Sequence, residues 1–142
     1  MNDMKSTGEE CLPSDELIVE NLDDGKYSLH AVAVRTQNGI DIYVGGGDLS
    51  HIGTVVISQP RLSLKGDGSI SCTTSVFNLL SHKDDAIAVP LAEELCKKLN
   101  QVVVVTAGVH IDNADKQEIE RFIRNLDCLG EALAERLLTA DG

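Results

Sequence analysis

The sequence predicts one α+β domain, in which two helices pack against a mainly antiparallel β-sheet in the order β-β-β-β-α-β-α. Three observations predict it: a hairpin turn at Asn38-Gly39, alternating apolar and polar residues up to residue 77, and helical spacing of apolar residues from about Asp84. The length of 142 residues suits a single hydrophobic core. We assign the polar residues 1–14 to a flexible N-terminal arm and residues 15–142 to the domain.

The first two predicted strands flank a tight turn. Asn38-Gly39 tolerates the positive φ angles of a type I′ turn, and the segments 27–36 and 40–44 on either side contain β-branched and aromatic residues. In the second segment every other residue is aliphatic, so one face points toward a core. These two segments are therefore expected to form a β-hairpin.

Three more strands follow the hairpin. We predict strands at 52–58, ended by Pro60, and at 70–77, after the turn residues 65–68. Loops this short leave no room for a crossover helix, so we expect consecutive strands to pair antiparallel. The later run 102–105 contains only valine, which is typical of a central strand covered on both faces.

Two helices are predicted after the change of period. In the first, from about Asp84, isoleucine and leucine recur every four residues, and Pro90 either kinks the helix or marks the start of its regular part. The second runs from Ala114 to about Leu138, with Asp112 or Asn113 as its N-cap. We interpret its apolar stripe as core. The stripe comprises Ile119, Phe122, Ile123, Leu126, Leu129, Leu133 and Leu137.

Composition excludes several classes of partner. The formal net charge of −11 repels nucleic acid and anionic lipid, and a chain with no Trp, two Tyr and two Phe has few platforms for base stacking. No apolar run approaches the roughly 20 residues that span a bilayer. The acidic N-terminus does not resemble a secretory signal, and the four cysteines are far apart. We therefore expect a cytoplasmic protein that binds neither nucleic acid nor membrane.

Two of four candidate segments for ligand binding lie in the first half of the chain. The glycine-rich segment 45–53 includes Gly47, His51 and Gly53, and its backbone N–H groups could bind an anion; a plain hairpin connection is an equal alternative. Arg61, in the second segment, carries a planar set of donors for phosphate or carboxylate. In a chain this acidic, however, an exposed arginine more often lies beside a surface carboxylate.

The other two candidate segments each follow a predicted strand. The sequence His82-Lys83-Asp84-Asp85 is a dense polar cluster where the chain changes direction, although its aspartates could simply cap the helix. Gly108 and His110 follow the central strand, just before a helix N-terminus, which is a common position for sites.

The sequence contains no coherent catalytic set. It has no G-x-S-x-G motif, its cysteines lie outside the four segments, and its histidine spacings do not suit a metal. We therefore predict that the protein is not an enzyme. A small hydrolase or metal enzyme that uses His51, His82 and His110 is the alternative that we rank last.

Four motifs of the chain resemble one protein family. The prenylated-flavin chaperones, which are the LpdD-like D subunits that accompany gallate-type decarboxylases, are similar in the segments GGGDLSHIG (45–53), QPRLS (59–63), ISCTTSVFNLLSHKDD (70–85) and VVVVTAGVHID (102–112). The resemblance covers about residues 27–138 in the same order, without the arm. It implies a fold similar to small proteasome-assembly chaperones, which tend to dimerise.

The resemblance implies an accessory role. Such proteins are thought to deliver or protect prenylated FMN (or FMN), bound transiently, during the maturation of a UbiD-type decarboxylase. The flavin prenyltransferase is a further candidate partner, and we expect a homodimer. A protein-assembly chaperone that binds no flavin is the alternative. The positions that the resemblance marks as cofactor-binding are Gly47, His51, Gly53, Arg61, His82, Lys83, Asp84, Asp85, Gly108 and His110.

The sharpest expectation about the site is convergence. A flavin phosphate is an anion, and a protein this acidic needs a local group of cations to hold it. We expect one concave surface to bring together His51, Arg61, His82, Lys83 and His110.

Overall fold

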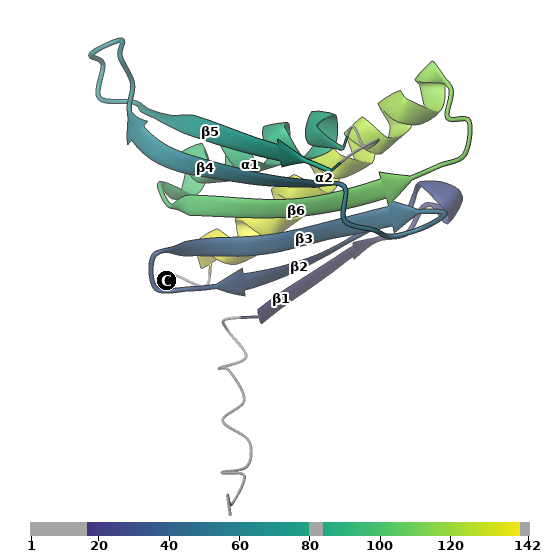
Figure 1. The fold of residues 1–142 in the computed structure, drawn as a ribbon. Helices are drawn as coiled ribbons and strands as arrows, with labels where there is room; N and C mark the ends of the chain where they lie inside the picture. The colour runs from purple at the N-terminus through teal and green to yellow at the C-terminus, as the bar shows by residue number, and fades with distance from the viewer. Residues whose placement is uncertain (1–16, 80–83, 140–142) are drawn as a thin grey trace, which may run out of the picture.

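A six-stranded sheet carries two helices on one of its faces (Figure 1). The computed structural model describes residues 17–79 and 84–139. The α+β prediction is confirmed, with one strand more than expected, because the short segment LIVENL forms an edge strand before the hairpin. The elements are β1 (Leu17–Leu22), the single 3₁₀ turn η2 (Gly25–Tyr27), β2 (Leu29–Arg35), β3 (Gly39–Gly47), β4 (Thr54–Leu62), β5 (Ile70–Asn78), α1 (Asp85–Leu99), β6 (Val102–His110) and α2 (Lys116–Thr139).

The strand order is β1-β2-β3-β6-β4-β5. Strand β6 lies between β3 and β4, parallel to the first and antiparallel to the second. The expectation that all consecutive strands pair is therefore wrong for β3 and β4. The connection 48–53 between them is long enough to step across an inserted strand, and the all-valine start of β6 gains most burial at the centre of the sheet. The predicted central position of β6 is confirmed.

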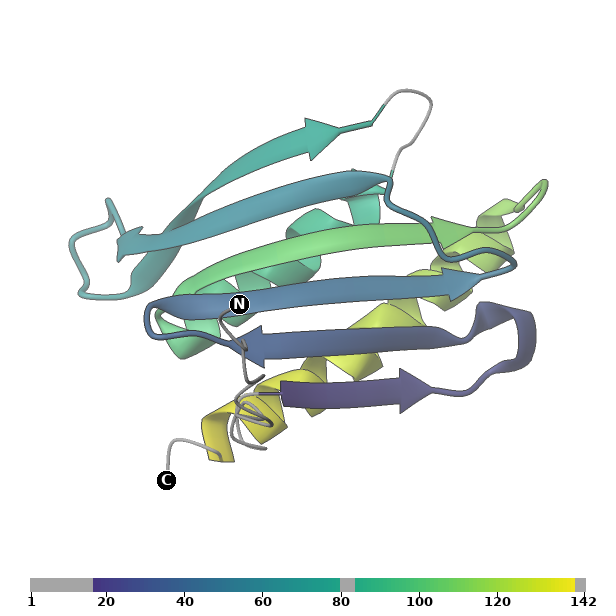
Figure 2. The same ribbon diagram turned by 60° about the horizontal axis from the view of Figure 1, so that its bottom comes forward.

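Both helices cover the same face of the sheet, and Figure 2 shows the other face with the helices behind it. On the helix side, Val103, Val105 and Ala107 of β6 are fully buried. On the open side, Val102 and Val104 are only partly buried. The expectation that this strand is covered on both faces is therefore wrong for the described chain, since the helices leave one face open.

Three strands are longer than predicted. Gly45–Gly47 belongs to β3 rather than to a loop, and β6 continues to His110. Strand β4 passes through Pro60, which lies opposite Cys72 of β5. Pro60 did not end the strand because the pairing of β4 with β6 stops at Ser58, so the missing N–H of proline costs no hydrogen bond to β6.

The helices begin slightly differently from the prediction. Helix α1 starts at Asp85 and includes Pro90 in its interior. Before α2, the Asp115 side chain accepts from the N–H of Glu118 (2.8 Å), and Glu118 accepts from the N–H of Asp115 (3.2 Å). This reciprocal pair is a capping box, so the predicted N-cap, Asp112 or Asn113, is wrong by two or three residues.

Candidate functional site

Several element ends meet at one edge of the sheet. Strands β3 and β6 are parallel and end there, the antiparallel strand β4 begins there, and β5 ends there beside it. Helix α1 follows β5 and helix α2 follows β6, so both helix N-termini lie at the same edge. This arrangement brings together Gly47, His51, Gly53, Asp84, Gly108 and His110 from segments that are far apart in the sequence.

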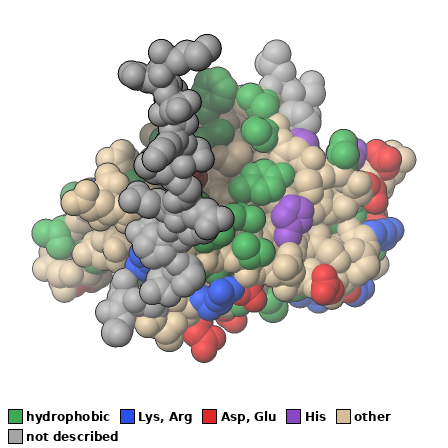
Figure 3. All heavy atoms as spheres, turned by 90° about the horizontal axis from the view of Figure 1, so that it is seen from below, with side chains coloured by type: hydrophobic (Ala, Val, Ile, Leu, Met, Phe, Trp, Pro, Cys, Tyr) green, Lys and Arg blue, Asp and Glu red, His purple; other side chains and the backbone are tan. Residues whose placement is uncertain are grey.

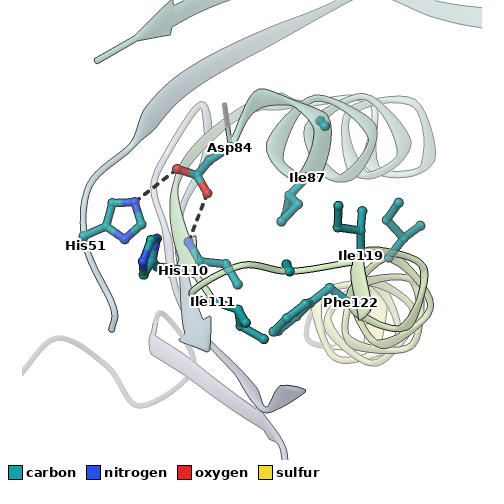
Figure 4. A pocket seen from close by; sticks show the side chains of 11 residues that line it. His51, Asp84, Ile87, His110, Ile111, Ile119 and Phe122 are labelled. Carbon is teal, nitrogen blue, oxygen red and sulfur yellow. Dashed lines mark hydrogen bonds and ion pairs between the residues drawn. The ribbon is translucent and has the colours of Figure 1, made fainter. Parts of the chain in front are cut away.

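Asp84 organises this edge (Figure 4). Its side chain is nearly buried, with 8% of its surface exposed, and its two oxygens have different partners. Oδ1 accepts from the backbone N–H of Val109 at 3.1 Å, and Oδ2 lies 3.2 Å from Nε2 of His51. Asp84 therefore joins the start of α1 to the end of β6 and to the β3–β4 connection.

His51 is held on both sides of its ring. Nδ1 lies 3.2 Å from the carbonyl oxygen of Leu49, and Nε2 lies against Asp84. The backbone carbonyl of His51 accepts from the hydroxyl of Tyr43 at 3.0 Å. These contacts fix the ring plane, and its neighbour His110 meets it edge-on, with ring centroids 6.1 Å apart.

Gly53 and Gly108 allow the close approach that builds this cluster. A Cβ atom at Gly53 would lie 1.8 Å from Oδ2 of Asp84, and one at Gly108 would lie 1.9 Å from the carbonyl oxygen of His51. Any side chain at either position would displace the His51–Asp84 pair. The two glycines therefore serve the packing of the site.

The glycine-rich segment does not offer all its backbone donors to a ligand. The N–H of Gly47 donates to the carbonyl of Ser28 (3.3 Å), and the N–H of Gly53 donates to Ala107 (2.9 Å). The next donor, Asp48, bonds the carbonyl of His110 at 2.7 Å. These three N–H groups bond within the protein and are not offered to an anion, which favours the alternative of a plain connection for this part of the segment.

A pocket of about 320 Å³ opens beside the two histidines (Figure 4). Its polar wall is formed by His51, Asp84 and His110, and His110 is the most exposed of them, with 48% of its side chain accessible. Its other walls are mostly apolar and come from α1, the end of β6 and the first turns of α2. The apolar lining residues are Ala86, Ile87, Val109, Ile111, Ala114, Ile119, Phe122 and Ile123.

The sequence did not reveal these apolar walls. Ile119 and Ile123 follow the helical period of the core stripe, yet they are 50% and 40% exposed. The remaining stripe residues, from Phe122 onward, are buried as predicted. The sequence feature that could have indicated the wall was the pair of isoleucines one helical turn apart at the N-terminal end of the stripe.

Arg61 lies away from this cluster. It is near the other end of β4, seven residues beyond Thr54, which corresponds to roughly 23 Å of extended strand. Its guanidinium donates to the hydroxyl of Thr73 (3.1 Å) and to the carbonyl of Leu62 (3.2 Å). The expected convergence thus holds for His51 and His110 but not for Arg61.

The remaining predicted residues have other positions. Asp85 is the first residue of α1, partly buried, and does not line the pocket. His82 and Lys83 lie outside the described residues, so the structure neither adds them to the site nor removes them.

Ion pairs fix the first turns of α2 near the pocket. The guanidinium of Arg121 donates to both oxygens of Asp24 at 2.6 and 2.8 Å, which lowers the pKa of that carboxyl. Lys26 donates to Glu118 at 2.6 Å and, with the Asp115 N–H, lowers the pKa of Glu118. These contacts tie η2 to α2.

Residues 17–79 and 84–139 contain neither a metal-ligand cluster nor a membrane-spanning helix. No group of three or more His, Cys, Asp or Glu side chains in that part could hold a metal ion. No helix there combines the length and the apolar character needed to cross a bilayer.

A solved structure of another protein has a similar fold. The chain is similar to a chain in the crystal structure of a chaperone complex for yeast 20S proteasome assembly, with a TM-score of 0.58 and 17% identity over 85% of this chain and 96% of that one. No protein with a curated function matches the sequence. A family model described as the prenylated flavin chaperone LpdD-like domain matches residues 23–138, most of the described chain. This is a family of chaperones and not of enzymes, and the chain belongs to it.

Proposed function

We propose that this protein is a cytosolic, non-catalytic chaperone that binds prenylated FMN, or FMN, transiently and passes it to a UbiD-type decarboxylase during its maturation. Membership of the prenylated flavin chaperone family supports the ligand class. The observation that carries the proposal is the pocket of about 320 Å³ that is lined by two histidines and by apolar side chains. Small-molecule sites have this size and composition.

The residues present suit a flavin. A flavin ring has an apolar edge and a polar edge. Both ring nitrogens of His51 have protein partners and Nε2 of His110 lies 2.8 Å from Asp112, so Nδ1 of His110 could bond the carbonyl or nitrogen atoms of the polar edge while His51 contacts it through its ring. Asp84 acts through His51 as a positioning residue, because both of its oxygens are already bonded. Bound flavin would supply its chemistry in the decarboxylase, and the chaperone need only hold and orient it.

Several features favour transient binding. His110 is half exposed and Ile119, on the opposite wall, is 50% exposed, so the pocket lies at the surface. The nearby Tyr27 ring is not available for stacking, since it packs edge-on against Phe122 at 5.5 Å. A ligand held mainly by apolar contact and a few hydrogen bonds can leave for a tighter site on the decarboxylase.

A titration followed by flavin fluorescence tests the binding. The purified protein should bind prenylated FMN, and His110→Ala should weaken binding about fivefold to tenfold, as expected for one lost hydrogen bond. His51→Ala should also weaken binding, because it removes a ring that forms part of the pocket wall. Arg61→Ala is the matched control and should bind as the wild type does, because it lies near the other end of β4. Lys83, one of the cations expected around the flavin phosphate, is tested in the same titration, in which Lys83→Ala should weaken binding.

Delivery is tested separately from binding. An apo-decarboxylase mixed with prenylated FMN should become holoenzyme faster in the presence of the chaperone, as followed by its flavin absorbance and activity. His51→Ala should slow this step. Addition of the flavin prenyltransferase as the source of cofactor tests whether that enzyme is a further partner.

The open face of the sheet supports the expected homodimer. Six strands of six to nine residues present roughly 600 to 850 Å² there, close to the about 800 Å² per partner of a standard interface. Figure 3, viewed from the side of this face, shows hydrophobic side chains gathered at its centre. Its apolar positions are Leu17, Val19, Val32, Val34, Tyr43, Val55, Ile57, Phe77, Val102 and Val104.

Charge also favours a second copy on this face. On the described part of this face, the side chains of the Asp, Glu, Lys and Arg types are Asp41 and Arg61, according to the strand pairing. The face therefore carries little charge, although the chain has a net charge of −11. Two copies can therefore meet there with little repulsion. Ile57→Lys, at a position 39% exposed, should give a monomer by light scattering at tens of micromolar, whereas Leu138→Lys on α2 should not. A monomeric wild type would contradict the dimer.

The titration also decides between this function and its alternative. A wild-type protein that dimerises but binds neither flavin would point to a protein-assembly chaperone. The similarity to a proteasome-assembly chaperone shows a shared fold and does not by itself favour that role.

A further inference from the structure

The pocket is divided into a polar side and an apolar side. His51, Asp84 and His110 lie on one side, and the isoleucines of α1, β6–α2 and α2 lie on the other (Figure 4). The oxygens of Asp84 are bonded to Val109 and His51, and both ring nitrogens of His51 have protein partners. Nε2 of His110 lies 2.8 Å from Asp112, so Nδ1 of His110 is the imidazole nitrogen that can meet a ligand. A ligand that fits must therefore present heteroatoms on one edge and hydrocarbon on the other.

Several side chains form the apolar side of the pocket. Ile119 and Ile123 lie one turn apart on α2, and Ile87 of α1 and Ile111 after β6 complete the wall around them. Ile119 and Ile123 expose 50% and 40% of their surface although the rest of the stripe is buried. Covering them with a ligand would remove apolar surface from water, which favours binding.

The apolar wall is also rigid. The capping box between Asp115 and Glu118 closes the first turn of α2, and Lys26 bonds the same glutamate at 2.6 Å. The Tyr27 ring supports Phe122 from behind. A wall held in this way loses little freedom when a ligand binds, which lowers the ordering cost of binding.

We infer that this apolar wall receives the hydrocarbon unit that prenylation adds to FMN, so that the protein distinguishes prenylated FMN from FMN. The inference rests on the proposed function and deepens it by assigning specificity to Ile119 and its neighbours. The flavin's polar edge then faces His51 and His110 on the other side of the pocket. FMN without the prenyl unit leaves the isoleucines exposed to water and binds more weakly.

The experiment compares two ligands with three proteins. Wild type, Ile119→Gln and Leu138→Gln are each titrated anaerobically with FMN and with prenylated FMN; both substituted residues lie on α2 and are 50% exposed. Wild type should bind prenylated FMN at least about tenfold more tightly, the effect of burying roughly two methylene groups. Ile119→Gln should lose most of this preference, because it weakens the binding of prenylated FMN much more than the binding of FMN. Leu138→Gln should keep the preference.

Each other outcome overturns the inference. Equal affinity of the wild type for the two flavins would refute the discrimination and leave flavin binding intact. Equal weakening of both ligands in Ile119→Gln would mean that the wall holds a part that they share, and no effect would mean that it holds neither. Binding of neither flavin by the wild type would refute the proposed function as well. If Ile119→Gln does not fold, as judged by circular dichroism, Ile123→Gln takes its place.

Discussion

Replacement of Asp84 by alanine should destabilise the protein far more than replacement of its neighbour Asp85. Asp84 is 7% exposed, and its carboxylate is the acceptor for the N–H of Val109 at 3.1 Å and the partner of His51 at 3.2 Å. Its backbone carbonyl, which accepts from the N–H groups of Ile87 and Ala88, is unaffected by the substitution. The change therefore removes the side-chain contacts and leaves the start of α1 in place.

The magnitude follows from these contacts. A part-buried N–H left without its acceptor costs about 1 to 2 kcal/mol, and the loss of the pair with His51 costs about 1 kcal/mol more. We expect Asp84→Ala to lower the free energy of unfolding by about 2 to 3 kcal/mol, a large part of the about 5 to 15 kcal/mol of a typical domain. Asp84→Asn keeps an acceptor for Val109 and should lose about 1 kcal/mol.

Urea denaturation followed by circular dichroism at pH 7 measures these differences. Asp85→Ala is the matched control, because it removes the same charge from the same helix end and should cost at most about 1 kcal/mol. An Asp84→Ala protein within about 0.5 kcal/mol of wild type, or no more destabilised than Asp85→Ala, would refute the organising role of Asp84.

Three further outcomes are expected. Gly53→Ala should destabilise about as much as Asp84→Ala, and the double variant should be less than additive, because the new methyl group occupies the place of the carboxylate oxygen 1.8 Å away. Leu133→Ala, at a fully buried position, should lower the free energy of unfolding by about 2 to 5 kcal/mol in the same assay. Arg121 lowers the pKa of Asp24 below its usual 3.8, so this pair stabilises the fold at neutral pH and its contribution disappears as the pH falls through the lowered pKa. Arg121→Gln should therefore be less stable than wild type at pH 7, and urea titrations should show the gap closing toward pH 2; a gap that stays constant would contradict the pairing.

Features that depend only on residues close together in the sequence could be predicted from the sequence alone. The hairpin of β2 and β3, the alternation in β3 and the helical period of α2 each arise from local geometry, and each was found as predicted. The predicted type I′ turn at Asn38-Gly39 is wrong, because Gly39 already belongs to β3 and neither residue has a positive φ. The family and the α+β class were also accessible, because motif order and element type are properties of the chain. Local patterns carry this information since side-chain periodicity follows directly from backbone geometry.

The arrangement of the site depended on the tertiary structure. Insertion of β6 between β3 and β4 is a non-local pairing, and it brings Gly108 against His51 and Asp84 against Val109. Arg61 has the right chemistry for a phosphate, yet the length of β4 carries it away from the histidines. The exposure of Ile119 was equally hidden, because its helical spacing equals that of the core residues. Sequence spacing indicates which side of a helix or strand a residue lies on. What lies opposite that residue depends on how the helices and strands pack against each other.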